Sequence, residues 1–243
     1  MERHYQLIDE IDSTNNAMKL ALYESEVPLF DVLAANRQTG GRGRQGRRFY
    51  SPAGGIYFSA AYPLPAGARS PAYLTLLAGL AIRDTLQKYA EKPLLIKWPN
   101  DIRAGEKKLC GVLTELIRAP FGLAAVVGVG VNVRLDETSL PEELKTTVTD
   151  LSAVGAKTVE RPVLIREIVE ALDRYVYAER ALERDLFLYR DAYNAVLCQR
   201  RQRVRRVSGG EILTGVAKGI DERGRLVIET ENGAVPVGDG IVE

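Results

Sequence analysis

The chain has 243 residues, of which 46% are hydrophobic and 27% are charged, and its 33 basic and 32 acidic residues give a formal net charge of +1. This composition is typical of a globular protein with room for one large core, or for a large domain and a small one. So small a net charge gives no global attraction to nucleic acid or to an anionic membrane, so a site for anions has to be local. The first ten residues contain no apolar core, which excludes a signal peptide, and no apolar run is long enough to span a bilayer.

The cysteines and the histidine exclude several other classes of site. Cys110 and Cys198 are far apart and match neither a CxxC pair nor a zinc-ligand spacing. Such thiols are typical of the reducing cytoplasm, so we expect a soluble, cytoplasmic protein. His4 is the only histidine, and alone it makes neither a metal site nor a hydrolase triad, so we assign it no role.

Capping residues and apolar periodicity predict the elements of a large N-terminal domain. A helix over 17–23 follows the capping side chains of Asp12 to Asn15. In chain order we then expect strands at 32–36 and 55–62, a helix at 71–89 with Pro71 near its start, strands at 94–97, 108–116 and 123–133, and a long helical region over 161–196. The fold class is therefore α+β, with a mixed or mostly antiparallel sheet backed by helices.

The pattern changes after Cys198. Short strands are expected at 203–207, 212–219, 225–229 and 234–237, and Asn232-Gly233 is a strong hairpin signal. We therefore expect two domains, residues 1–196 and a small β-barrel over 197–243. The basic run from Arg200 to Arg206 is either an RNA or carrier-protein contact or the solvent face of the first small-domain strand; alternation at Val204 favours the second.

A loop rich in glycine and arginine follows the predicted strand at 32–36, and residues 37–48 are called the Gly/Arg loop below. Residues 41–46 fit the dinucleotide-binding pattern G-x-G-x-x-G. That pattern needs a helix to begin at the loop and an acidic residue about 20 positions later. Instead, Pro52 and paired glycines follow, and residues 32–83 contain no Asp or Glu. A dinucleotide fold is excluded.

The arginines of this loop suit an anionic ligand. Guanidinium groups bind carboxylate and phosphate oxygens in pairs, and glycines let the backbone approach the ligand. The loop carries five of them: Arg37, Arg42, Arg44, Arg47 and Arg48. The alternative is a nucleic-acid patch, because Phe49 and Tyr50 can stack on an adenine as easily as on a splayed base.

Lys97 ends an apolar strand and precedes the turn-forming sequence Pro99-Asn100-Asp101. A lysine held at that point can bridge a carboxylate and an α-phosphate as a point charge. The alternative is a snorkelling lysine on an edge strand.

Five segments together resemble the catalytic domain of biotin–protein ligases. Residues 12–15 resemble the family's D-S-T-N, 38–47 its G-R-G-R-x-G-R loop, 97–101 its K-W-P-N-D, 108–115 its K-[IL]-x-G-[IL]-L-x-E, and 128–132 its G-[IV]-G-[IV]-N. The β-rich tail is similar to the family's small SH3-like C-terminal domain, so the resemblance covers essentially the whole chain. It implies a class II synthetase-like fold with an SH3-like barrel.

The resemblance implies a two-step reaction. Biotin and MgATP give biotinyl-5′-AMP and pyrophosphate, and a lysine of a biotin carboxyl carrier protein then takes the biotin and releases AMP. A loop closing over the adenylate would protect it from hydrolysis. Carried over position by position, the resemblance implies Lys97 and Arg44 as catalytic residues; Ser13, Thr14, Asn15, Gln38, Gly41, Arg42, Gly43, Arg44, Lys97 and Gly111 as biotin-binding; and Arg42, Arg44, Arg47, Phe49, Lys97 and Asn132 as ATP- or adenylate-binding. The magnesium ligands are not identified.

The resemblance also bears on partners and on rival functions. Family members often pair through sheet edges, which allows a homodimer. Ser13 lies too near Met1 to leave room for the winged helix-turn-helix of many members, so we expect no DNA binding. A lipoate–protein ligase or octanoyl transferase shares the fold and is the nearest alternative; a nucleic-acid-binding module using the Gly/Arg loop is the alternative from another class.

Overall fold

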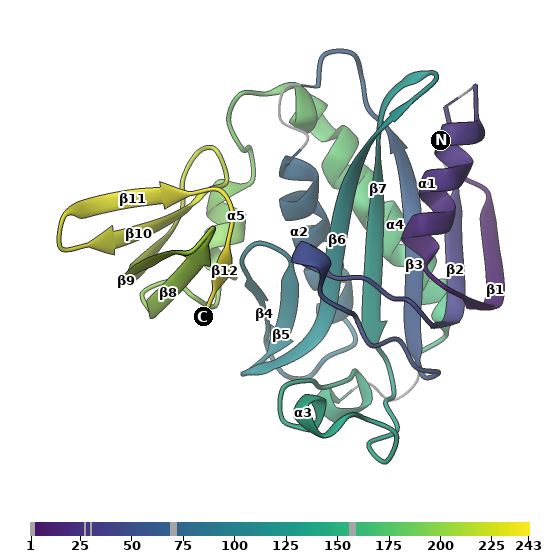
Figure 1. Cartoon of the computed structure of the whole chain (residues 1–243), viewed down its shortest axis with the longest axis horizontal. Helices are drawn as coiled ribbons and strands as arrows, with labels where there is room; N and C mark the ends of the chain where they lie inside the picture. Colours follow the sequence, from purple (N-terminus) through teal and green to yellow (C-terminus); the bar gives the residue numbers. More distant parts are fainter. Residues whose placement is uncertain (1–2, 27, 30, 69–71, 156–158) are drawn as a thin grey trace.

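The computed structural model describes residues 3–26, 28–29, 31–68, 72–155 and 159–243. A seven-stranded sheet, in the order β1-β2-β3-β7-β6-β5-β4, forms the centre of the larger domain (Figure 1). Its strands are β1 (Tyr5–Ile11), β2 (Val32–Gln38), β3 (Gly55–Pro63), β4 (Leu94–Lys97), β5 (Asp101–Ala104), β6 (Lys107–Ala119) and β7 (Gly122–Asn132). Only the β1–β2 pairing is parallel among the described strands of this sheet, which confirms the expected mixed sheet.

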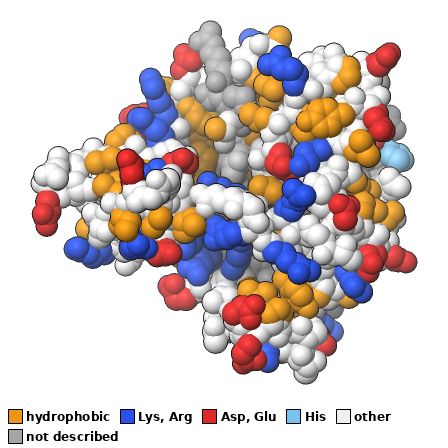
Figure 2. Space-filling view, in the orientation of Figure 1, with side chains coloured by type: hydrophobic (Ala, Val, Ile, Leu, Met, Phe, Trp, Pro, Cys, Tyr) orange, Lys and Arg blue, Asp and Glu red, His pale blue; other side chains and the backbone are white. Residues whose placement is uncertain are grey.

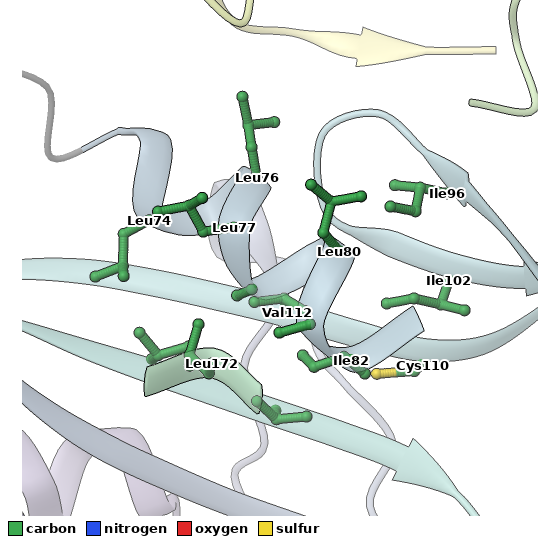
Figure 3. Packing of buried hydrophobic residues seen from close by; sticks show 14 of the residues in the cluster. Leu74, Leu76, Leu77, Leu80, Ile82, Ile96, Ile102, Cys110, Val112 and Leu172 are labelled. Carbon is green, nitrogen blue, oxygen red and sulfur yellow. The ribbon is translucent and has the colours of Figure 1, made fainter. Parts of the chain in front are cut away.

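Helices cover both faces of the sheet (Figure 1). On one face, α2 (Tyr73–Gln87) and α4 (Arg161–Tyr177) pack against the sheet and form the main core. Figure 3 shows Leu74, Leu77 and Leu80 of α2 beside residues from the strands and Leu172 of α4. On the other face lies α1 (Thr14–Glu24), which packs Met18 and Leu22 against β3, β6 and β7. The backing by helices is therefore confirmed.

Strand alternation decides which residues reach the α1 face. Along β7, Val127, Val129 and Val131 belong to the core under α2 and α4. Because successive side chains of a strand point to opposite faces, the intervening Gly128 and Gly130 face the α1 side. This side of the sheet therefore has a stretch without side chains beside the start of α1.

The prediction of one long helical region over 161–196 is wrong, because this part of the chain is not a continuous helix. It divides into α4, a 3-10 segment η3 (Ala178–Glu183) and the short α5 (Arg190–Ala195). Between them the chain leaves helical geometry and Phe187 enters the core, where its ring lies 6.2 Å from that of Tyr193. The expected helix at 71–89 is present as α2, but Pro71 lies outside the described residues.

The sequence-based expectation missed two strands of the larger domain, β1 and β5, and the short last strand of the chain, residues 241–242. β1 is mostly exposed because it is an edge strand, so it has no apolar alternation to reveal it. β5 begins directly after the turn at 98–100 and pairs with β4, so the sequence signal of the turn hides a tight hairpin. The remaining short elements of this domain are η1 (Arg44–Gly46), α3 (Glu142–Lys145) and η2 (Ser152–Val154).

A second, antiparallel sheet forms the C-terminal part, in the order β11-β10-β9-β8-β12. Its strands are β8 (Arg203–Ser208), β9 (Glu211–Ile220), β10 (Leu226–Thr230), β11 (Gly233–Val237) and β12 (Ile241–Val242). Thr230 pairs with Gly233, which confirms a hairpin here but places its turn at Glu231-Asn232, one residue before the expected Asn232-Gly233. Trp98 donates from Nε1 to the Gly224 carbonyl at 3.1 Å, joining the two parts.

The basic run of β8 is engaged in surface ion pairs, which join Arg205 to Glu243 and Arg206 to Asp239. This placement favours a solvent face over a nucleic-acid contact. No helix among the described residues is both long and apolar enough to cross a membrane.

Candidate functional site

A cavity opens between the Gly/Arg loop, the start of α1 and the bare stretch of the sheet, with an empty volume of about 750 Å³ that includes the solvent at its mouth. Figure 2 shows Lys and Arg side chains gathered near the middle of this face, between the small and large domains. The cavity is lined by Ser13, Thr14, Asn15, Gln38, Arg42, Gly43, Arg44, Arg47, Arg48, Phe49, Asn100, Asp101, Lys108, Gly111, Val112, Leu113, Gly128, Val129 and Gly130. Loop and strand residues that are distant in sequence therefore meet at one site.

The floor of the cavity is backbone. Gly111 of β6 pairs directly with Gly130 of β7. A Cβ at Gly130 would lie 2.5 Å from the Phe49 ring, and a Cβ at Gly111 would lie 2.9 Å from it. An aromatic ring rests on the floor at this distance only because both positions lack side chains, so the floor suits a flat ligand.

Gly128 beside this floor is required for a different reason. A Cβ at this position would lie 2.0 Å from Oδ1 of Asn15. We expect Gly128→Ala to reduce the free energy of unfolding by about 1–3 kcal/mol, because the buried amide has to move. Urea unfolding would measure the change. Gly238→Ala is the control, since its Cβ would meet no atom within 4 Å; equal effects of the two changes would contradict the steric argument.

The polar end of the cavity is formed by Ser13, Thr14 and Gln38. Ser13 caps α1, where its Oγ accepts from the backbone N–H of Asn16 at 3.4 Å. Gln38 Oε1 accepts from the backbone N–H of Thr14 at 2.9 Å, and Gln38 Nε2 donates to Ser51 Oγ at 3.0 Å. These bonds leave the Ser13 hydroxyl proton and the second N–H of Gln38 for a ligand.

The opposite end of the cavity is cationic. Lys108 pairs there with Asp101, the one carboxylate among the described lining residues, and Arg44 lies beside Asn100; the cavity is also lined by Arg42, Arg47 and Arg48. Arg44 donates from Nη1 to Oδ1 of Asn100 at 3.4 Å. Burial lowers the pKa of Arg44 from its ordinary value, partly offset by the nearby Asp101. This end is suited to a ligand with more than one negative charge.

Lys97 is not among the residues that line the cavity; Lys108 is. Lys97 pairs with Asp101, which pairs with Gly111, so Lys97 lies one strand beyond the cavity edge. Burial, and next the proximity of Arg103, lower the pKa of Lys97. The cation over the floor is Lys108, whose Nζ lies 2.7 Å from Oδ1 of Asp101 and 5.4 Å from the centre of the Phe49 ring.

A register shift between β5 and β6 explains the orientation of Lys108. Strict alternation from Gly111 would turn Lys108 towards the opposite face of the sheet. Between Ile102 and Arg103 the register shifts, so that Arg103 pairs with Lys108 and one residue of β6 is left over. A bulge of this kind re-aims the side chains beyond it.

The Gly/Arg loop folds back on itself. Isolated bridges join Gln38 to Ser51 and Arg42 to Arg48, and the chain then enters β3. The next element after the loop is the strand β3 and not a helix, in agreement with the exclusion of a dinucleotide fold. Gly41 does not line the cavity; a Cβ there would lie 2.4 Å from the Phe49 carbonyl oxygen, so Gly41 permits the loop to close on itself.

Two predicted residues have structural partners that occupy their amides. Asn15 donates from Nδ2 to Glu115 and to the Leu113 carbonyl, although it also lines the cavity. Asn132 donates to the Thr149 carbonyl at 2.9 Å and lines a neighbouring recess instead.

That neighbouring recess is more apolar and adjoins the cavity at Arg48, Phe49 and Lys108. Its other walls include Tyr50, Leu135, Leu140, Pro141 and Leu144. Sequence patterns did not indicate the segment 135–148, because it has no regular periodicity. Among the described residues no three His, Cys, Asp or Glu side chains form a cluster that could hold a metal ion.

Comparisons with known proteins match both the larger domain and the C-terminal part of this chain. A family model described as the biotin/lipoate A/B protein ligase family matches residues 7–132, and one described as the biotin protein ligase C terminal domain matches residues 202–242. The bifunctional ligase/repressor BirA of Bacillus spizizenii is 31% identical over 237 residues, covering 96% of this chain and 71% of that protein. The biotin–[acetyl-CoA-carboxylase] ligase of Mycobacterium tuberculosis is 33% identical over 226 residues, covering 87% of this chain and 77% of that protein.

Similarity extends to solved structures. The biotin protein ligase of Aquifex aeolicus in complex with biotin and ATP superposes with a TM-score of 0.84 and 29% sequence identity. The match covers 99% of this chain and 97% of that one, so it includes both sheets.

Proposed function

This chain belongs to the biotin/lipoate A/B protein ligase family, and from that membership we propose that it is a biotin–protein ligase, which forms biotinyl-5′-AMP from biotin and ATP and transfers the biotin to a lysine of a biotin carboxyl carrier protein. One observation carries the assignment: a single cavity has a polar end, a flat floor without side chains and a cationic end, in that order. Biotin has a urea at one end, a compact bicyclic ring and a carboxylate at the other end. The order of groups in the ligand matches the order in the cavity.

The polar end receives the urea group in this proposal. The Ser13 hydroxyl and the free N–H of Gln38 donate to the urea oxygen, and Thr14 contacts a urea N–H. The ring lies on the Gly111–Gly130 floor. Phe49 now rests on this floor, so it must move aside and can then cover the ligand.

The cationic end brings two anions together. A carboxylate oxygen of biotin attacks the α-phosphorus of ATP, the bond from that phosphorus to the oxygen bridging to the β-phosphate breaks, and pyrophosphate leaves. Lys108 takes the bridging position that sequence reasoning gave to Lys97, with Arg44 and Arg47 on the phosphates. Fixed cations at the developing charge lower the barrier without reorganisation of water.

The adenine occupies the apolar recess beside Phe49. Its aliphatic walls provide a purine-sized surface adjoining Lys108, so the α-phosphate lies at the junction of the two spaces. Magnesium would enter with the triphosphate. Asp101 is the one carboxylate among the described residues that line the cavity, and it is paired with Lys108. Phosphate oxygens and water would therefore supply most of the magnesium ligands.

In the second step the carrier lysine attacks the acyl carbon of the adenylate, loses a proton, and AMP leaves. We propose that the C-terminal domain supports the binding of ATP and of the carrier protein. We also propose that two copies of the chain form a homodimer through the edges of their sheets. Two free cysteines and dependence on ATP fit a cytoplasmic enzyme.

The direct test is incubation with biotin and MgATP followed by native mass spectrometry. We expect a bound species with the mass of biotinyl-5′-AMP, and none when either substrate is omitted. Failure to detect either this species or biotin-dependent ATP–pyrophosphate exchange would contradict the proposal.

Lipoate is the competing substrate. Biotin should raise the melting temperature by several degrees at saturating concentration, because only the folded state binds it. Lipoate should have little effect, since it has no urea for Ser13 and Gln38. Stabilisation by lipoate alone would instead assign the chain to the lipoate branch of the family.

A further inference from the structure

The face of the large sheet that carries α4 is not fully covered at its outer edge. β1 is the outermost strand (Figure 1), and its Tyr5 pairs with Val32 of β2. Leu7 pairs in the same way with Ala34. Paired residues of neighbouring strands point to the same face, and Val32 and Ala34 belong to the core under α2 and α4. Tyr5 and Leu7 therefore face the side of α4, although they remain 37% and 58% exposed.

A groove lies between this overhanging edge and the first turns of α4, and it is named the edge groove below. Its empty volume is about 1040 Å³, which includes the solvent at its mouth. Leu7, Ala34 and Ile56 form its floor, and Pro162 and Ile165 of α4 stand against them. The groove therefore offers an apolar surface that a ligand can remove from water.

The charged side chains among the described lining of the edge groove are two arginines, and Asp and Glu are absent from that lining. Arg161 donates from Nη1 to Oδ1 of Asn36 at 3.4 Å. The guanidinium carbon of Arg166 lies 5.7 Å from the centre of the Tyr5 ring. Asn36 and Val32, the partner of Tyr5, belong to one strand, so these two contacts lie about 13 Å apart along the sheet. One guanidinium group therefore stands at each end of the apolar floor.

Both guanidinium groups keep donors for a ligand. Neither forms an ion pair with a carboxylate in the part of the chain that the structure describes. Asp9, which lies outside the lining, accepts from Nδ2 of Asn36 at 2.9 Å. A carboxylate can only accept, so the amide of Asn36 turns its oxygen to Arg161 and holds that side chain at its end of the groove.

We propose that the edge groove binds a linear aliphatic dicarboxylate, with one carboxylate on Arg161, the other on Arg166 and the methylene chain along the floor between them. Guanidinium groups bind carboxylates through paired, charge-assisted hydrogen bonds. An apolar pocket with a few polar groups at fixed positions is the usual form of a small-molecule site. The inference does not rest on the proposed function.

The edge groove and the first cavity share no described residue. They also open on opposite faces of the sheet, since the first cavity lies beside the start of α1. Asn36 and Gly55, which line the edge groove, flank residues 37–54, so it lies at the base of the Gly/Arg loop. A ligand of the edge groove is therefore expected to bind without competition from biotin or ATP.

Isothermal titration calorimetry with suberate and octanoate tests both ends of the groove, because these two acids have chains of equal length. We expect suberate to bind about tenfold more tightly, the effect of one additional charge-assisted contact. Dimethyl suberate keeps the chain but carries no charge, so it should bind more weakly than either acid. Equal affinities for suberate and octanoate, or no detectable binding of suberate, would overturn the proposal.

Arg161→Met and Arg166→Met each remove one charge and keep most of the aliphatic side chain. In either variant suberate should lose its advantage over octanoate, and the double variant should bind neither acid measurably. The melting temperature should change little, since neither arginine has an ion-pair partner to lose among the described residues. A tenfold advantage of suberate that persists in both single variants contradicts the two-ended arrangement.

Leu7→Glu places a negative charge on the floor and should abolish suberate binding. Its matched control is Leu20→Glu on α1, because Leu20 is 57% exposed and Leu7 is 58% exposed. Arg44→Ala is a second control, since the cationic end of the first cavity also attracts anions. We expect both controls to bind suberate normally. Binding that is lost in Arg44→Ala and kept in Leu7→Glu would place the ligand in the first cavity and refute the edge groove as its site.

Discussion

Replacing Lys108 with alanine is expected to lower biotin-dependent ATP–pyrophosphate exchange by about a hundredfold or more. Lys108 is the lysine that stands over the glycine floor, and removing one fixed donor from a developing charge costs this much in other enzymes. The loss also leaves the Asp101 carboxylate without its partner, where it repels both incoming anions. Steady-state exchange at saturating ATP, with biotin varied, would measure the effect.

The matched control is Lys97→Ala, on the neighbouring strand. Lys97 is a half-buried lysine outside the cavity lining, so its loss should change the exchange rate only a few-fold. Both variants should keep the fold, since the Lys108–Asp101 ion pair is partly exposed and contributes little to stability, and Lys97 is only half-buried. If Lys97→Ala is the inactive variant and Lys108→Ala is not, the bridging role belongs to Lys97, as the resemblance implied.

Replacing Arg44 with alanine is expected to have the second largest effect, on retention of the adenylate. Arg44 belongs to the Gly/Arg loop and lies within hydrogen-bond distance of Asn100. It lines the cavity and also a second groove, whose walls include Trp98 and Arg223. Without it the loop loses a cationic contact with the phosphate, so biotinyl-5′-AMP should leave and hydrolyse. AMP release without carrier biotinylation should rise at least about tenfold.

Arg44→Lys separates charge from geometry at the same position. Lysine keeps the positive charge but not the planar pair of donors, so an intermediate leakage rate is expected. The measurement is the ratio of AMP formed to carrier biotinylated in a single turnover. A ratio that stays at one in Arg44→Ala would exclude Arg44 from holding the adenylate.

Much of the fold could be predicted because its signals are local. Most of the expected strands follow apolar runs bounded by turn residues, and the first helix follows a capping serine that forms the expected bond. The elements that were missed or predicted wrongly also have local causes. An exposed edge strand such as β1 carries no alternation, and the region 161–196 keeps helical composition although the chain breaks to bury Phe187.

The candidate site could be predicted only in part. Ser13, Thr14, Gln38 and four of the five loop arginines line the cavity, and they were identifiable as residue types. The fifth, Arg37, instead forms an exposed ion pair with Glu10. The structure alone shows that Asn15 and Asn132 use their amides on protein partners. The structure also reveals the apolar recess. The segment 135–148, which lines part of it, carries no sequence motif, so only its position in the fold identifies it.

By itself, the sequence determined most of the elements, the small β-rich C-terminal part, the family and the cluster of arginines in one loop, because capping, alternation and residue clustering act over short stretches of chain. Only the tertiary structure decided which lysine lines the cavity. Lys97 and Lys108 both lie near strand ends, and simple alternation would turn Lys108 away from the cavity. A single register shift against β5 reverses that orientation. Such a shift depends on the pairing partner of a strand, which the residues of that strand do not encode.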